Sequence, residues 1–129
     1  MIFSYRVTIP KNTPPSNPYE QFLPLHKGVI KKLVVSIPAG HAGLTYFALK
    51  RGNNQVFPYN PDQKFSGDNL TLIFDEVNYP ILVEPFGLQF EGANLDDTYD
   101  HDVLIYLQLM TKEEFLMSKG IYWPEEGLV

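Results

Sequence analysis

The residues best suited to chemistry form an acidic cluster late in the sequence. Asp96, Asp97, Asp100 and Asp102 lie within seven positions of one another. Because carboxylate oxygens are the ligands that Ca²⁺ prefers, this cluster is a candidate calcium site. It lacks the alternating ligands, the central glycine and the glutamate at the twelfth position that define an EF-hand loop. The cluster is therefore better interpreted as a solvated loop that leads into a strand.

No other group of residues indicates catalysis. The three histidines, His26, His41 and His101, are far apart and show none of the short spacings typical of zinc sites. Segment 40–43 contains two glycines but lacks the lysine and the following helix that a phosphate-binding loop requires. Cysteine is absent. A glycosidase-like pair of distant carboxylates remains open, but we expect neither enzyme activity nor a cofactor.

Length and composition indicate one soluble domain. The chain has 129 residues and a mass of 14.8 kDa, and 44% of its residues are hydrophobic. No stretch approaches the roughly 20 apolar residues of a membrane-spanning helix, and residues 1–10 lack the apolar core of a signal peptide. The net charge of −5 repels phosphate backbones and anionic membranes. These features predict synthesis in the cytoplasm, with no nucleic-acid and no membrane partner.

The elements that must position these residues are predicted to be strands. Eleven prolines, nine phenylalanines and eight tyrosines disfavour a helical bundle and favour strands joined by rigid turns. Alternating or apolar runs predict strands over 2–9, 29–37, 44–51, 55–57, 70–74, 79–83, 87–91 and 103–110. Such short, closely spaced strands are typical of sandwiches and jelly rolls. We predict an all-β fold: a single domain over residues 1–129, built as an antiparallel β-sandwich or jelly roll.

Three segments lie outside these strands. Four prolines among polar residues predict an extended Pro-rich arm over residues 11–25. One short C-terminal helix is expected over residues 111–120, because Thr111 and Glu114 form a capping-box pattern and Gly120 suits the position after the helix. Residues 121–129 form a C-terminal tail that we expect to dock on another surface.

Two of the predicted strands are apolar on both faces. In segment 44–49 and in segment 103–110, leucine, isoleucine or aromatic residues occupy both sets of alternate positions. A sheet with one face in the core and the other in solvent should carry polar residues on the solvent-facing side. Both faces are therefore expected to be covered, either by the arm, helix or tail of the same chain or by a partner subunit.

The turns between the predicted strands carry several distinctive motifs. These are Ile37-Pro38-Ala39-Gly40 with Ala42-Gly43-Leu44, Arg51-Gly52 with Gln55, Phe57-Pro58, Asn60-Pro61-Asp62, and Asn94-Leu95-Asp96-Asp97-Thr98-Tyr99. Together they resemble a family of small virion structural proteins of tailed bacteriophages, which includes decoration-like or cement-like β-sandwiches. The resemblance extends roughly over residues 5–109 and leaves residues 111–129 unmatched.

The resemblance implies a non-enzymatic structural subunit of a phage-like particle, either a capsid decoration or cement protein or another virion component. Such a subunit, made in the host cytoplasm and located in the virion, contacts copies of itself and particle proteins such as a major capsid protein. Because aromatic anchors dominate interface energetics, the expected contact residues are Tyr19, Phe22 and Leu23 in the arm, and Tyr122 and Trp123 in the tail. The same side chains could instead pack on their own chain.

A carbohydrate-binding β-sandwich is the alternative hypothesis. In that case aromatic side chains would present flat rings to a sugar beside polar loop groups; the candidates are Tyr46, Tyr59, Tyr79, Tyr99 and Trp123. The sequence contains these rings but does not indicate that they converge.

Overall fold

Nine strands and one helix form the part of the chain that this computed structural model describes, residues 1–120. The elements are β1 (Ile2–Ile9), β2 (Tyr19–Pro24), β3 (Gly28–Ile37), β4 (Thr45–Arg51), β5 (Asn54–Phe57), β6 (Leu70–Phe74), β7 (Tyr79–Ile81), β8 (Gly87–Asn94), β9 (His101–Met110) and α1 (Lys112–Ser118). Every strand pairing is antiparallel. The predicted all-β class, with antiparallel sheets and one short C-terminal helix, is confirmed.

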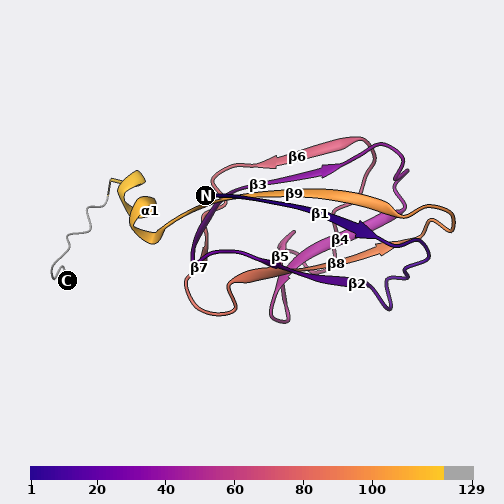
Figure 1. The fold of residues 1–129 in the computed structure, drawn as a ribbon, viewed down its shortest axis with the longest axis horizontal. Helices are drawn as coiled ribbons and strands as arrows, with labels where there is room; N and C mark the ends of the chain where they lie inside the picture. The colour runs from indigo at the N-terminus through magenta and orange to yellow at the C-terminus, as the bar shows by residue number, and fades with distance from the viewer. Residues whose placement is uncertain (121–129) are drawn as a thin grey trace.

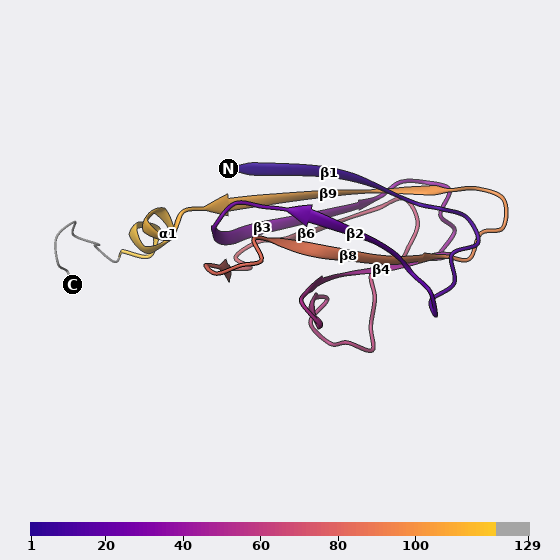
Figure 2. The same cartoon turned by 60° about the horizontal axis from the view of Figure 1, so that its bottom comes forward.

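The strands form two sheets that enclose one core. One sheet has the order β1-β9-β3-β6, with β7 paired to β3, and the other has the order β2-β8-β4-β5. Figures 1 and 2 show the two sheets as two layers. Both layers contribute to the same cluster of buried side chains, in which Val35 and Leu107 of the first sheet join Phe47 and Phe90 of the second.

Alternation of side chains produces these layers. In β9 the buried positions are every second residue, and Val103, Ile105, Leu107 and Leu109 are each at most 1% exposed. Successive side chains of a strand point to opposite faces, so one face of β9 lies in the core. Between β4 and β5, the left-handed backbone of Gly52 (φ 62°) forms the tight turn that the sequence predicts.

The extended arm expected over residues 11–25 is not confirmed. Residues 19–24 instead form β2, which pairs with β8 in register from Tyr19 opposite Gly92 to Pro24 opposite Gly87. The preceding loop is tied by a bridge between Thr13 and Asn94. The prolines of this segment obscured the strand in the sequence. Pro24, which ends β2, is compatible with the sheet because β2 is an edge strand, where a missing N–H group costs little.

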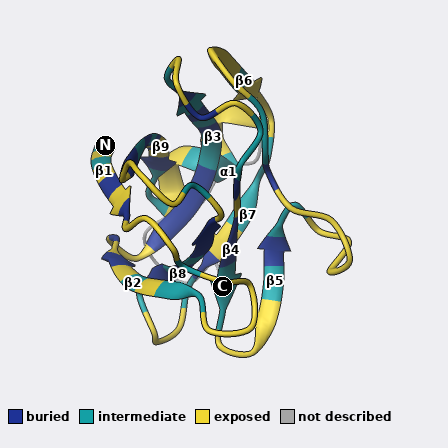
Figure 3. Cartoon of the chain, turned by 90° about the vertical axis from the view of Figure 1, so that its right-hand side faces the viewer, coloured by how far each residue is buried: buried dark blue, intermediate teal, exposed yellow. Residues whose placement is uncertain are grey.

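The two strands that are apolar on both faces are fully covered on one face and only partly covered on the other. Phe47 of β4 and Leu107 of β9 are fully buried, whereas Tyr46 and Tyr106 on the opposite faces are 39% and 37% exposed. Figure 3 shows such alternating burial along the strands. Residues 1–120 therefore leave the second face of these strands partly exposed, and its cover by a partner subunit stays a prediction.

The short helix follows the prediction closely. The Glu114 amide donates to Thr111 Oγ1 at 3.0 Å, and the Thr111 amide donates to Glu114 Oε1 at 2.8 Å, which completes the capping box. After the helix, Lys119 Nζ lies 3.1 Å from Glu76 Oε2. Within residues 1–120, no helix is long and apolar enough to cross a membrane. The predicted tail, residues 121–129, lies outside the described part.

Candidate functional site

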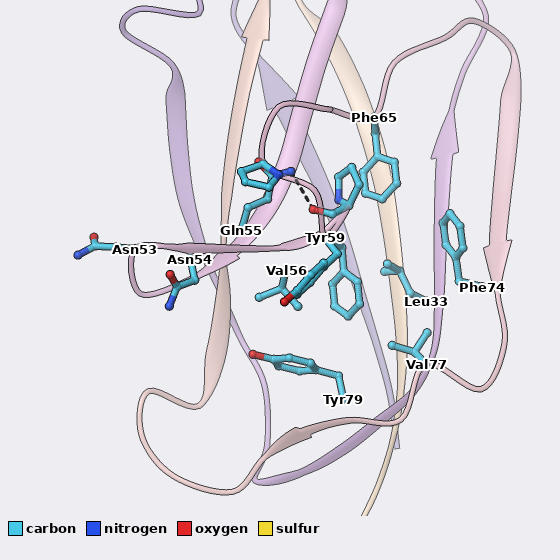
Figure 4. A pocket seen from close by; sticks show the side chains of 13 residues that line it. Leu33, Asn53, Asn54, Gln55, Val56, Tyr59, Phe65, Phe74, Val77 and Tyr79 are labelled. Atoms are coloured by element: carbon cyan, nitrogen blue, oxygen red, sulfur yellow. Dashed lines mark hydrogen bonds between the residues drawn. The ribbon is translucent and has the colours of Figure 1, made fainter.

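A large open groove lies beside β5 and β6, the free edges of the two sheets. Its volume is about 910 Å³. The groove is lined by Leu33, Asn53, Asn54, Gln55, Val56, Phe57, Pro58, Tyr59, Pro61, Phe65, Phe74, Val77 and Tyr79. In Figure 4 the apolar and aromatic side chains face a common space from β3, β5, β6, β7 and the neighbouring loops, whereas Asn53 points away from it. We call this hollow the aromatic groove.

A single glutamine shapes the loop that forms one wall of the aromatic groove. Gln55 Nε2 donates to the carbonyls of Pro58, Asn60 and Gln63 at 2.8, 3.1 and 2.8 Å. Its Oε1 accepts from Lys64 Nζ at 2.7 Å. Because both polar ends of Gln55 are engaged in this way, the side chain organises the loop rather than offering free groups to a ligand.

Aromatic and aliphatic side chains form most of the rest of the groove. Phe57 meets Tyr79 edge-on with ring centroids 5.7 Å apart, and the Phe65 and Phe74 rings lie 5.9 Å apart. The Tyr59 side chain is 85% exposed although it lines the groove. No carboxylate, imidazole or ammonium group is among the lining residues. The groove is therefore suited to binding an apolar or aromatic ligand by packing.

A histidine pair forms the second site, and the sequence did not predict it. His41 and His101 were interpreted as isolated, yet their ring centroids lie 4.6 Å apart. Both are buried, at 1% and 8% exposure. They line a hollow of about 400 Å³ together with Arg6, Asp100 and Asp102, among others. Sixty residues separate them in the sequence, so no local spacing could reveal the contact.

The hydrogen bonds of His41 define its protonation. Its Nε2 lies 2.9 Å from the Asp102 carbonyl, which can only accept, so Nε2 carries the proton. Its Nδ1 then accepts from Thr45 Oγ1 at 2.7 Å. Burial lowers the pKa of His41, although the Asp102 carbonyl opposes this effect; the proximity of His101 lowers the pKa further. His41 is thus a neutral ring that joins the two sheets.

The four aspartates of the candidate calcium site do not converge. Asp96 Oδ2 accepts from His101 Nε2 at 2.9 Å, and this hydrogen bond, followed by the Thr98 amide, lowers the pKa of Asp96. The other three bind separate partners: Asp97 binds the Thr98 hydroxyl, Asp100 the Lys11 amide and Asp102 the Thr8 hydroxyl. Within residues 1–120, no group of three or more acidic, His or Cys side chains is placed to hold a metal ion.

The predicted contact residues differ in their exposure to solvent. Phe22 is 45% exposed and available to a partner, and Tyr19 is half-buried with its hydroxyl bound to Gln21. Leu23 is fully buried in the core of its own chain, which corrects its assignment as a contact residue. It points inward because it alternates with Phe22 along β2. Tyr122 and Trp123 lie outside the described residues.

The tyrosines proposed for sugar binding converge in part. Tyr59 and Tyr79 share the aromatic groove, as Figure 4 shows. Tyr46 lines a separate hollow with Pro15 and Pro18. Tyr99 is 67% exposed in the loop before β9, and Trp123 is outside the described part.

An apolar row crosses the outer face of the five-stranded sheet. Val34 of β3 stands opposite Tyr106 of β9 on one side and Ile73 of β6 on the other. Ile73 is 58% exposed and Tyr106 is 37% exposed. Polar groups flank the row, including the Arg6–Asp102 and Lys32–Asp75 ion pairs. An apolar centre with a polar rim is the anatomy of a protein–protein interface.

Comparison with known proteins finds no relative of this chain. It matches no protein-family model, no curated protein and no solved structure.

Proposed function

We propose that this protein is a non-enzymatic structural subunit of a phage-like particle, acting as a capsid decoration or cement protein or as another virion component. The observation that carries the proposal is the apolar row of Tyr106, Val34 and Ile73 on the outer face of the five-stranded sheet. A single exposed apolar residue is ordinary on a soluble protein. Three in register across neighbouring strands form a patch that is suited to burial against another subunit.

The strand pairing supports a jelly-roll sandwich as the scaffold. With β7 set aside, the pairs β1·β9, β2·β8, β3·β6 and β4·β5 are nested one inside another. Nested pairs arise when one long antiparallel hairpin rolls up so that its strands divide between two sheets. We infer a jelly roll, an architecture found in viral capsid proteins and also in lectins. A fold alone does not establish a function, so the proposal depends on the apolar row rather than on the jelly-roll topology.

The proposed partners are other copies of this chain and particle proteins such as a major capsid protein. Contacts would centre on the apolar row, with Phe22 on the other sheet as a second exposed anchor. The protein would be made in the host cytoplasm and located in the virion. It would stabilise the particle by binding the assembled form preferentially, because a ligand that favours one state shifts the equilibrium towards it.

Substitution within the apolar row tests the proposal. Ile73→Glu places a charge at the β6 end of the row, whereas Val83→Glu places the same charge at a 67% exposed apolar residue outside the row. We expect stoichiometric co-sedimentation of the wild-type chain and the Val83→Glu variant with intact particles, and its loss for Ile73→Glu. Circular dichroism should show that both variants fold. Equal incorporation of the two variants would contradict the proposed contact, and absence of the wild-type chain from particles would contradict the structural role.

A carbohydrate-binding domain is the second candidate, favoured by the shared position of Tyr59 and Tyr79 in the aromatic groove. Flat aromatic rings can stack on the apolar faces of sugars, and Asn53 and Asn54 lie at the same groove. A glycan array with wild-type protein and a Tyr79→Ala variant tests this candidate. Binding that depends on Tyr79 would support it, and an array without any bound glycan would contradict it.

A further inference from the structure

The aromatic groove is an apolar surface that lacks a cover among residues 1–120. It lies between two free sheet edges, and Tyr59 at its wall is 85% exposed. Burying such a surface is favourable by about 25 cal/mol per Å² of apolar area. A groove of this size suits a short peptide segment with large apolar side chains, because aromatic anchors contribute most where a pocket excludes water.

One segment of the chain outside the described residues has this composition. The sequence Ile121-Tyr122-Trp123-Pro124 follows the helix directly and contains the only tryptophan of the protein. Isoleucine, tyrosine and tryptophan offer a large contact area, and proline limits the conformational freedom that is lost on binding.

Ion pairs link the end of the described chain to a residue at the rim of the aromatic groove. Glu76 binds both Lys119, at 3.1 Å, and Lys31, at 2.6 Å, and thereby ties the end of α1 to the segment after β6. The next residue, Val77, lines the groove, and its amide donates to the Lys31 carbonyl at 3.0 Å. Through these contacts the Lys119 side chain reaches the residue that directly precedes Val77 of the groove wall.

The segment is tethered closely to the end of the helix. Trp123 is the third residue after Gly120, so the Cα atoms of the two residues can lie at most about 10 Å apart. A segment tethered this closely has an effective concentration in the millimolar range, which a free partner would have to exceed. The groove is therefore more accessible to its own C-terminal segment than to the same segment of another molecule.

We propose that the aromatic groove binds the C-terminal segment Ile121–Pro124 of the same chain, with the Trp123 side chain packed against the groove. The proposal does not depend on the structural role in a particle. It adds an intramolecular docking site that fixes the C-terminal end of the protein onto the open side of the two sheets.

The single tryptophan makes the proposal directly measurable in the full-length protein. We expect Trp123 fluorescence at a shorter wavelength than that of tryptophan in water, protection from acrylamide, and no change on serial dilution. Tyr59→Ser removes an exposed groove ring, and Tyr99→Ser removes an exposed ring outside the groove. Tyr59→Ser should shift the emission to longer wavelength and increase quenching. Tyr99→Ser should leave both unchanged.

Three results would overturn the proposal. Water-exposed emission from the wild-type protein would show that the segment does not dock. Buried emission unaffected by Tyr59→Ser and by Phe74→Ser would place Trp123 on another surface. Burial that is lost on dilution would assign the groove to the segment of a second copy. Since each result comes from the isolated protein, failure here is distinguishable from failure of incorporation into particles. A glycan that binds the groove while Trp123 remains exposed would favour the carbohydrate alternative.

Discussion

At the scale of single residues, the buried pair of His41 and Thr45 shows how two polar groups are accommodated between the sheets. Both are at most 1% exposed, and each satisfies the other through the bond between Nδ1 and Oγ1. Buried polar groups are tolerated when they are hydrogen-bonded in this way. The bond to the Asp102 carbonyl also makes His41 a link between the turn before β4 and strand β9.

The buried neutral His41 predicts a loss of stability in mild acid. Because the pKa of His41 in the folded protein lies below its ordinary value of 6.5, the unfolded chain takes up the proton first as the pH falls. The free energy of unfolding should therefore decrease as the pH falls below about 6.5. Urea titrations from neutral to mildly acidic pH check this, and His41→Asn should have a smaller slope.

A wild-type stability that is constant over this range, or a His41→Asn variant with the same slope, would contradict the prediction. The lowered pKa values of Asp96 and Glu76 do not interfere. Their contribution to stability is lost as the pH falls below about 5, towards a pKa of about 2 in the case of Glu76.

At the scale of elements, the burial pattern of β2 is set by its pairing with the neighbouring strand β8. Its Leu23 is fully buried and its Phe22 is 45% exposed, although the two are neighbours. The ladder with β8 fixes this alternation, because a strand shifted by one residue would exchange its two faces. The partner strand accommodates β2 closely: a Cβ atom at Gly87 would lie 2.6 Å from the Leu23 carbonyl oxygen.

This arrangement predicts opposite outcomes for adjacent substitutions. Leu23→Ala should lower the free energy of unfolding by about 2–5 kcal/mol, because it leaves a cavity in the core. Phe22→Ala, on the outer face, should cost at most about 1 kcal/mol. Denaturant titration of the two variants measures both. Similar small losses would show that residues 19–24 are not integrated into the sheet.

At the scale of the whole molecule, the two layers depend on the segment that was expected to be an arm. Removing residues 11–24 deletes β2 and uncovers the edge of β8, whose Leu88 and Phe90 are fully buried. We predict that this deletion prevents formation of the native fold rather than abolishing assembly alone. Near-ultraviolet circular dichroism and thermal melting test this. A cooperative melt near the wild-type temperature would contradict it.

The sequence alone determined much of the element content. Strands β1 and β6 coincide with their predicted ranges, because alternating side chains and flanking turn residues are local signals. The helix was predictable for the same reason, since a capping box involves residues only three positions apart. β2 was missed because its signal is its pairing with β8, about 70 residues away, while the prolines before it and Pro24 at its end are typical of a loop.

Only the tertiary structure decided which side chains meet. The aromatic groove joins Leu33 to Phe57 and Tyr79, and the histidine pair joins residues 41 and 101. Such contacts depend on strand order and on the packing of two sheets, which local periodicity does not specify. The acidic cluster shows the converse: its aspartates are close in sequence, yet Asp96, Asp100 and Asp102 bind His101, Lys11 and Thr8, which lie in different parts of the chain. Spacing along the chain defines elements, whereas proximity in space defines sites.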